Sequence, residues 1–70
     1  MDLNKLRADL WAFVMRIYES PKAFYDIRSE VGVEAFSGLV RASHANGLMT
    51  MESRDLALAG KCCYANEEMP

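Results

Sequence analysis

Helix-breaking residues divide the 70-residue chain into four short segments, and this division limits the fold more than any other feature. Ser20–Pro21 predicts the end of one helix and the start of the next, because proline disfavours helical backbone at the preceding residue and suits a first turn. Gly32, Asn46–Gly47 and Gly60 predict further stops, since glycine and asparagine commonly end helices. No segment keeps a strand-like alternation for more than a few residues. The sequence therefore predicts an all-α fold, a small bundle of three to four helices.

The first segment has the most regular helical period and predicts the longest helix, from near Asp2 to Ser20. Asp2 is suited to cap this helix, and apolar residues follow mostly at spacings of three and four. These residues cover an arc of about 100°, which is the width of a stripe that faces a core. The stripe expected to face the core consists of Leu3, Leu6, Leu10, Phe13, Val14 and Ile17.

The later segments predict three shorter helices. The second runs from about Pro21 to Val31 and the third from about Val33 to Ala45, while Thr50 is positioned to cap a short fourth helix. Leu48 is expected to pack back on the third helix in a Schellman motif. Residues 1–60 are thus expected to form a single domain, and residues 61–70 a frayed tail. The expected core positions are Phe24, Ile27 and Val31 in the second helix, and Val33, Phe36, Leu39 and Val40 in the third.

The composition is that of a globular protein, with 51% hydrophobic and 26% charged residues and a net charge of -2. The longer apolar runs, Leu10–Met15 and Leu56–Ala59, are far shorter than the roughly 20 residues that a membrane-spanning helix needs. No charged segment precedes an apolar one at the N-terminus, as it would in a signal peptide. We therefore expect a cytoplasmic protein without a membrane partner.

Residue types that carry chemistry are present, but none has the pattern of a catalytic or metal site. His44 is the only histidine and is expected at a helix end, although a base or pH switch is the alternative. Cys62 and Cys63 are adjacent, which disfavours a disulfide between them, and reduced packing is favoured over oxidant sensing. The sequence predicts no enzyme, no cofactor and no metal. The acidic residues expected on a solvated face are Asp26, Glu30 and Glu34.

The first segment carries a second apolar row in addition to its core stripe. Trp11, Met15 and Tyr18 recur at i, i+4 and i+7, about 120° around the helix from that stripe. Tryptophan and tyrosine are enriched at binding hot spots, and methionine adapts to irregular surfaces. This row is either a surface that contacts a second chain or a second buried side of a central helix.

These features favour a small non-enzymatic adaptor or inhibitor that binds another protein, either a second copy in a homodimer or a larger target. In size and acidity the chain is similar to small accessory proteins of phages and plasmids, without matching a family. The alternative is a helix-turn-helix regulator formed by 21–45, with Ser37, Arg41 and His44 as DNA-reading residues. A net charge of -2 makes nucleic acid the less favoured partner, because neutralising phosphates supplies much of DNA affinity.

Overall fold

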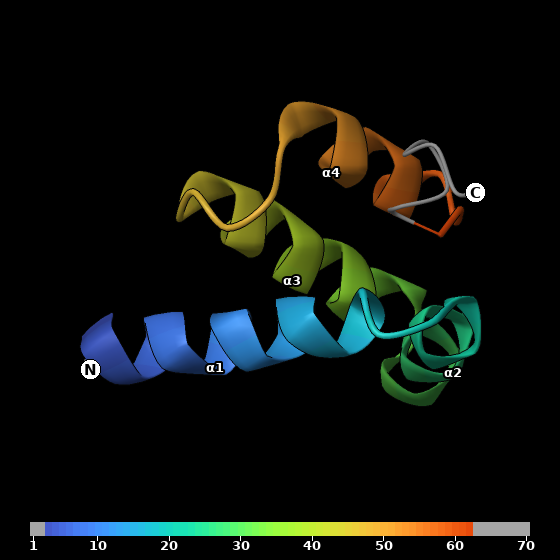
Figure 1. Cartoon of the computed structure of the whole chain (residues 1–70), viewed down its shortest axis with the longest axis horizontal. Helices are drawn as coiled ribbons and strands as arrows, with labels where there is room; N and C mark the ends of the chain where they lie inside the picture. The colour runs from blue at the N-terminus through green and yellow to red at the C-terminus, as the bar shows by residue number, and fades with distance from the viewer. Residues whose placement is uncertain (1–2, 63–70) are drawn as a thin grey trace.

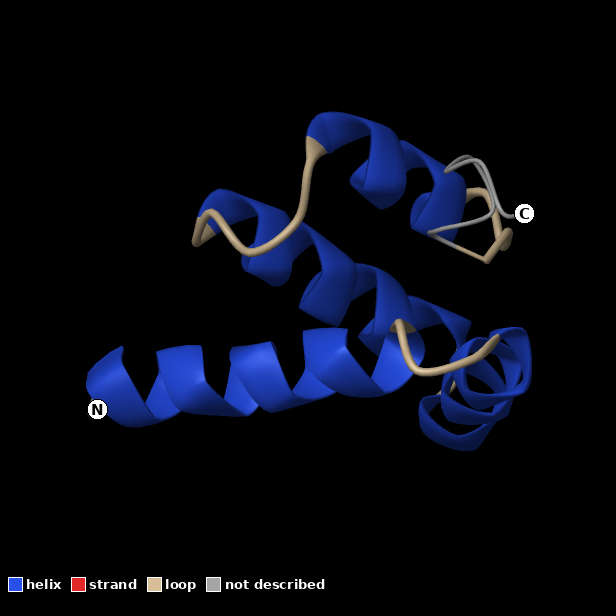
Figure 2. Cartoon of the chain, in the orientation of Figure 1, coloured by secondary structure: helices blue, strands red, loops and turns tan. Residues whose placement is uncertain are grey.

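A computed structural model describes residues 3–62, which form four α-helices and no strand (Figures 1 and 2). The predicted all-α fold is confirmed, and the first helix is the longest. The helices are α1 (Leu3–Ile17), α2 (Pro21–Val31), α3 (Val33–Ala45) and α4 (Met51–Leu58). α3 is the central element, because it packs against each of the other three helices. The predicted cap Asp2 lies outside the described residues, as do residues 63–70 of the tail predicted over 61–70.

Local backbone chemistry at Ser20 separates α1 from α2. Ser20 is extended (φ -165°, ψ 159°), and its hydroxyl accepts a hydrogen bond of 3.0 Å from the amide of Ala23. This arrangement confirms that Ser20 caps α2 and that Pro21 occupies its first turn. The prediction that the first helix continues to near Ser20 was wrong, because α1 ends at Ile17. A residue that caps the next helix must be extended, so Tyr18 and Glu19 form the turn that leads into it.

Gly32 alone connects α2 to α3. Its amide donates to the carbonyl of Arg28 (3.0 Å), and its carbonyl accepts from the amide of Phe36 (2.9 Å), so one residue closes one helix and opens the next. The backbone of Gly32 has φ 92° and ψ 151°. This region of conformational space is essentially restricted to glycine, because a Cβ clashes with the backbone there. The predicted stop at Gly32 is therefore confirmed.

Replacing Gly32 with alanine is expected to destabilise the fold by about 1–3 kcal/mol, the usual cost of a strained backbone conformation. The matched control is Gly38→Ala in α3, where an added Cβ would meet no atom within 4 Å. That control is expected to raise stability by about 0.5–1 kcal/mol, because alanine is the better helix former. Urea unfolding followed by circular dichroism measures both changes. Equal effects of the two substitutions would contradict this account of Gly32.

α3 ends in the Schellman motif that the sequence predicted. The amide of Leu48 donates to the carbonyl of Ser43 (2.9 Å), and the amide of Gly47 donates to the carbonyl of His44 (2.9 Å). Gly47 has φ 76°, the left-handed conformation that this motif requires. The chain consequently turns away from α3 directly after its last turn.

α4 is short but defined at both ends by local hydrogen bonds. The hydroxyl of Thr50 accepts from the amide of Ser53 (3.1 Å), which confirms the predicted cap. At the other end, the amide of Lys61 donates to the carbonyl of Leu56 (2.9 Å), while Gly60 has φ 81°. This is a second Schellman ending, so α4 stops where the sequence predicted.

Aromatic rings form the centre of the core. The ring centroid of Phe36 lies 5.2 Å from that of Phe24 and 5.6 Å from that of Phe13, both in edge-on geometry. Such pairs are favourable beyond the apolar area that they bury. Cys62, which follows α4, is also buried in this cluster. The remaining buried members of the cluster are Val14, Ile17, Ile27, Val40, Met49 and Ala57.

Three residues predicted to face the core are instead on the surface. Leu6 is 39% exposed because the N-terminal turns of α1 extend beyond the packed core, which begins at Leu10. Val31 and Val33 are 40% and 56% exposed. They flank Gly32 at the corner where the chain changes direction, and helical period alone does not reveal which positions a corner leaves uncovered. Only the backbone of Leu3 is described.

Within residues 3–62, no helix combines the length and the apolar character that crossing a bilayer requires.

Candidate functional site

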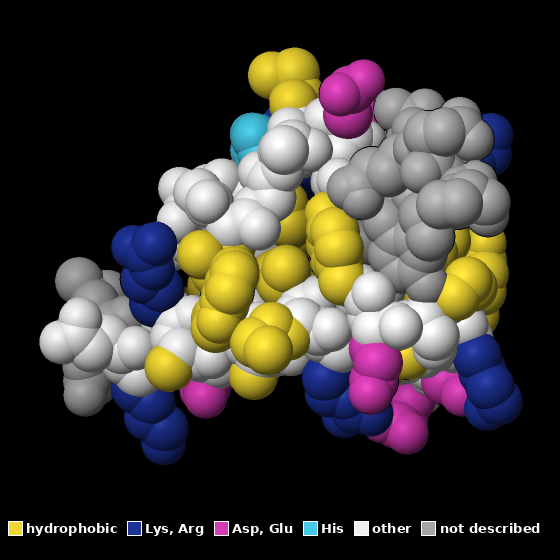
Figure 3. Space-filling model, viewed as in Figure 1, with side chains coloured by type: hydrophobic (Ala, Val, Ile, Leu, Met, Phe, Trp, Pro, Cys, Tyr) yellow, Lys and Arg dark blue, Asp and Glu magenta, His cyan; other side chains and the backbone are white. Residues whose placement is uncertain are grey.

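A groove separates α1 from α4. Both helices pack against α3, but no pair of Cα atoms from α1 and α4 lies within 8 Å in the described helices. Apolar side chains line the hollow between them, as the space-filling view shows (Figure 3). The larger part, here called the inner half, has a volume of about 470 Å³. Its lining residues are Trp11, Val14, Met15, Tyr18, Leu48, Met49, Thr50, Glu52, Ser53 and Leu56.

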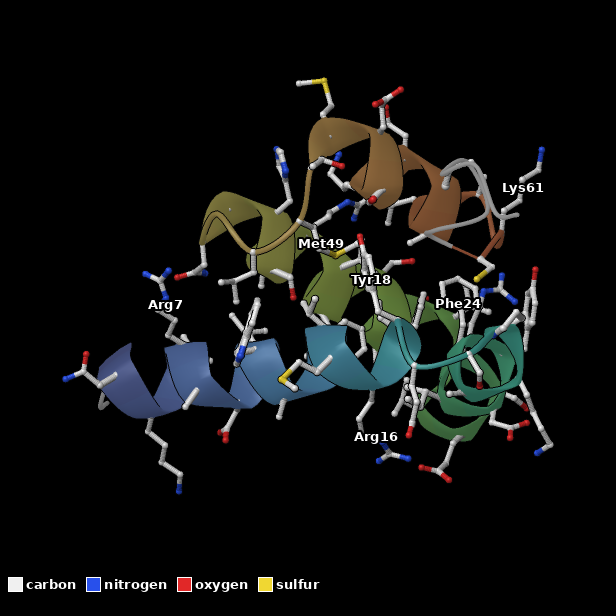
Figure 4. The ribbon with its side chains drawn as sticks, viewed as in Figure 1. Arg7, Arg16, Tyr18, Phe24, Met49 and Lys61 are labelled. Atoms are coloured by element: carbon white, nitrogen blue, oxygen red, sulfur yellow. The ribbon has the colours of Figure 1, made fainter. Side chains whose placement is uncertain are left out.

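A second hollow of about 400 Å³, here called the outer half, lies beside the N-terminal turns of α1. Trp11 and Leu48 line both halves, so the two hollows meet at these side chains. The side-chain view shows Arg7 on this side of α1, whereas Arg16 points away from the groove (Figure 4). The remaining lining residues of the outer half are Asn4, Arg7 and Ala8, so α4 contributes no residue to this hollow.

The structure divides the predicted second apolar row into two parts. Trp11 is 50% exposed and Met15 is 57% exposed, so the helices described within residues 3–62 do not wrap either side chain. Tyr18 is half-buried and packs against the core. Trp11 and Met15 thus form the exposed part of one wall of the groove, whereas Tyr18 lines the inner half from a partly covered position.

A hydrogen bond between Tyr18 and Ser53 links the end of α1 to α4 across the groove. The Tyr18 hydroxyl donates to the Ser53 hydroxyl oxygen over 2.8 Å. Figure 4 shows the Tyr18 side chain extending from the end of α1 toward α4. Ser53 is buried, so its hydroxyl depends on partners within the protein. This bond joins the two walls within the inner half.

Removing this bond by Tyr18→Phe is expected to cost about 0.5–1.5 kcal/mol of stability, the net value of a typical hydrogen bond. The double variant Tyr18→Phe/Ser53→Ala should cost less than the sum of the two single changes, because both remove the same interaction. Chemical denaturation of the four proteins measures the coupling. Strictly additive effects would show that the two hydroxyls do not support each other.

The floor of the groove comes from the connection between α3 and α4. Met49 is buried there, and its carbonyl lies 3.0 Å from the Nδ1 of His44. A carbonyl only accepts hydrogen bonds, so Nδ1 carries the proton and donates it. His44 therefore holds the connection that carries Leu48 and Met49. Its position in the last turn of α3 agrees with the predicted place near a helix end.

The residues of the alternative DNA-binding interpretation lie along α3, but they do not form an open polar surface. Arg41 is exposed, whereas Ser37 and His44 are half-buried and His44 is bonded to the connection. The link between α2 and α3 is Gly32 alone, whereas a helix-turn-helix uses a turn of three or four residues. The geometry thus departs from that motif at its turn.

The other residues singled out in the sequence do not form a polar cluster. Asp26 pairs with Lys22 over 2.7 Å, and this hydrogen bond raises the pKa of Lys22. Cys62 is buried, and its amide donates to the Tyr25 hydroxyl (3.2 Å), while Cys63 lies outside the described residues. In the described part of the chain, no group of three potential ligands could hold a metal ion. Glu30 and Glu34 are exposed, as expected for a solvated face.

Sequence reasoning found the α1 wall of the groove but not the opposite wall or the floor. Glu52 and Leu56 come from α4, and Met49 from the connection, more than 30 positions further along the chain than Trp11. No pattern in the sequence connects these segments to α1. Comparisons with models of known families, with curated proteins and with solved structures found no match.

Proposed function

We propose that this chain is a small non-enzymatic protein-binding protein, an adaptor or inhibitor, and that it contacts its partner through the groove between α1 and α4. The observation that carries this proposal is the half-exposure of Trp11 and Met15 on adjacent turns beside an apolar hollow. Burying large side chains of this kind releases water from apolar surface. Tryptophan is among the residue types that contribute most of the binding energy at many protein interfaces.

The polar chemistry of the groove supports protein binding over catalysis or capture of a polar small molecule. Sites of those kinds place several polar groups around one point. In this groove the Tyr18 and Ser53 hydroxyls are bonded to each other. The charged side chains that line it, Arg7 and Glu52, belong to different halves. Apolar contact is therefore the main interaction that the groove offers.

A photocrosslinking amino acid at position 15 in native host cells tests this function, because the Met15 side chain is exposed beside the groove. We expect a covalent adduct with a protein, and we expect Trp11→Ala to abolish it. The matched control places the same crosslinker at Lys22, which is exposed on α2 outside the groove. The absence of an adduct from position 15, or equal adducts from both positions, would contradict the proposed function.

A further inference from the structure

We propose that Asn46 is a site of spontaneous deamidation, which the native end of α3 blocks and which local opening of that end permits. This chemistry is independent of the proposed protein-binding function. The chain contains three asparagines, Asn4, Asn46 and Asn66, and only Asn46 precedes a glycine. A glycine leaves its own amide nitrogen the least hindered for attack on the preceding side chain, because no Cβ stands beside it.

The reaction joins neighbouring groups of Asn46 and Gly47. The Gly47 amide loses its proton to hydroxide, and its nitrogen then bonds to the side-chain carbonyl carbon, Cγ, of Asn46. The bond from Cγ to Nδ2 breaks, and Nδ2 takes up a proton from water and leaves as ammonia. Water opens the resulting succinimide ring at either carbonyl, which gives aspartate or isoaspartate. The net change consumes water, releases ammonia and involves no oxidation.

The native backbone holds the two reacting groups apart. Asn46 has φ -93° and ψ 9°. A ψ this close to zero places the Gly47 nitrogen beside the backbone nitrogen of Asn46, whereas ring closure requires it on the same side of the Cα–C bond as Cβ. The Gly47 amide also donates to the carbonyl of His44 over 2.9 Å. The reaction therefore requires a rotation about the Cα–C bond of Asn46 that breaks this hydrogen bond.

The side chain of Asn46 is held as well. Its Nδ2 donates to the carbonyl of Ala42 over 2.8 Å, and its backbone amide donates to the same carbonyl over 3.0 Å. The amide of Leu48 donates back to the carbonyl of Ser43 over 2.9 Å, across the bond that must rotate. Helix ends open locally at a lower free energy than the whole fold. Deamidation of Asn46 is therefore coupled to opening of the Schellman ending of α3.

The products do not fit the native ending. The aspartate carboxylate cannot donate a hydrogen bond to the Ala42 carbonyl as Nδ2 does. Its charge lies at the C-terminus of α3, where the helix dipole disfavours an anion. Isoaspartate adds a carbon to the main chain within the ring that the hydrogen bond from Leu48 to Ser43 closes. Either product makes a transient opening lasting, directly before the groove residues Leu48 and Met49.

Mass spectrometry of the chain and its peptides tests the proposed site. The chain is incubated in mildly alkaline buffer, either native or unfolded in guanidinium chloride. In the unfolded chain we expect Asn46 to react about tenfold faster than Asn4 and Asn66 or more, because only Asn46 precedes glycine. In the native chain we expect Asn46 to react about tenfold more slowly than in the unfolded chain or more. Asn46→Gln is the control, because glutamine would have to close a larger ring, and it should abolish the modification at this position.

Two results of this experiment would overturn the proposal. One is equal rates at Asn46 in the native and unfolded chains, which would show that the native ending gives no protection. The other is faster reaction at Asn4 or Asn66 in the unfolded chain, which would show that Asn46 is not the favoured site.

The hydrogen bond between His44 and Met49 tests the opening step. The His44 Nδ1 lies 3.0 Å from the Met49 carbonyl, and this bond closes the loop that contains Asn46 and Gly47. His44→Ala should raise the native rate by about twofold to tenfold, the factor that corresponds to one hydrogen bond, and leave the unfolded rate unchanged. Lys22→Ala removes an exposed ion pair on α2 and should alter neither rate. An unchanged native rate in His44→Ala would contradict control by the end of α3.

Asn46→Asp reproduces one product directly and tests its effect on the fold. We expect the melting temperature to fall by about 5–15 °C, because a hydrogen bond is lost and a charge is placed unfavourably. The matched control is Asn4→Asp in the first turn of α1, where an anion is favourable, so the melting temperature should fall by no more than about 3 °C. Equal melting temperatures of the two variants would show that the ending of α3 tolerates the product, against the proposal.

Discussion

Replacing Phe36 with alanine is expected to leave most of the protein unfolded at room temperature. Phe36 is 1% exposed, and its ring contacts those of Phe13 and Phe24 on two other helices. Truncation of a buried phenylalanine costs about 3–5 kcal/mol, because apolar burial is lost and a cavity remains. A core of this size rarely supplies more than about 3–5 kcal/mol of net stability. One substitution can therefore remove the entire net free energy of unfolding.

Thermal unfolding followed by circular dichroism measures this effect, with Phe36→Leu as the conservative control. Leucine fills much of the same space, so the control should remain folded with a lower melting temperature. For a domain of this length, a loss of 1 kcal/mol lowers the melting temperature by about 4–8 °C. A fall of only a few degrees for Phe36→Ala would show that the aromatic cluster is not the centre of the core.

Replacing Trp11 with alanine is expected to weaken partner binding by about thirtyfold or more while leaving the fold intact. A hot-spot residue contributes about 2 kcal/mol or more, which corresponds to that factor. Half of the Trp11 surface is buried in the free protein, so truncation also removes apolar contact, but less than it would at a core position. The stability of the variant should therefore fall by about 1–2 kcal/mol. A buried tryptophan would instead cost about 3–5 kcal/mol.

Calorimetric titration with the crosslinked partner measures the change in affinity, and thermal unfolding measures the change in stability. Leu6→Ala is the matched control, because Leu6 is a partly exposed apolar residue of α1 outside both halves of the groove. This control should leave affinity unchanged. A Trp11→Ala variant that melts far lower but binds normally would assign the side chain to the fold and not to the interface.

The helices themselves could be predicted because their ends depend on neighbouring residues. Ser20 and Thr50 cap through their own hydroxyls, and Gly47 and Gly60 adopt the positive φ that the Schellman motif requires. Each of these interactions joins atoms at most five residues apart. Interactions of this kind depend only on residues that are close together in the sequence, so the sequence predicts them. The all-α fold and the four segments followed from it.

The sequence alone also identified one wall of the groove, because a second apolar row on a helix is a local pattern. Only the tertiary structure decided which residues of that row stay exposed. Trp11 and Met15 remain open because no described helix crosses that part of α1, whereas Tyr18 meets Ser53, 35 positions away. Leu6 and Leu10 are equivalent by helical period, yet only Leu10 is covered. Whether a residue of α1 is buried depends on where helices distant in the sequence pack against it. The spacing of residues within one helix does not determine where those helices pack.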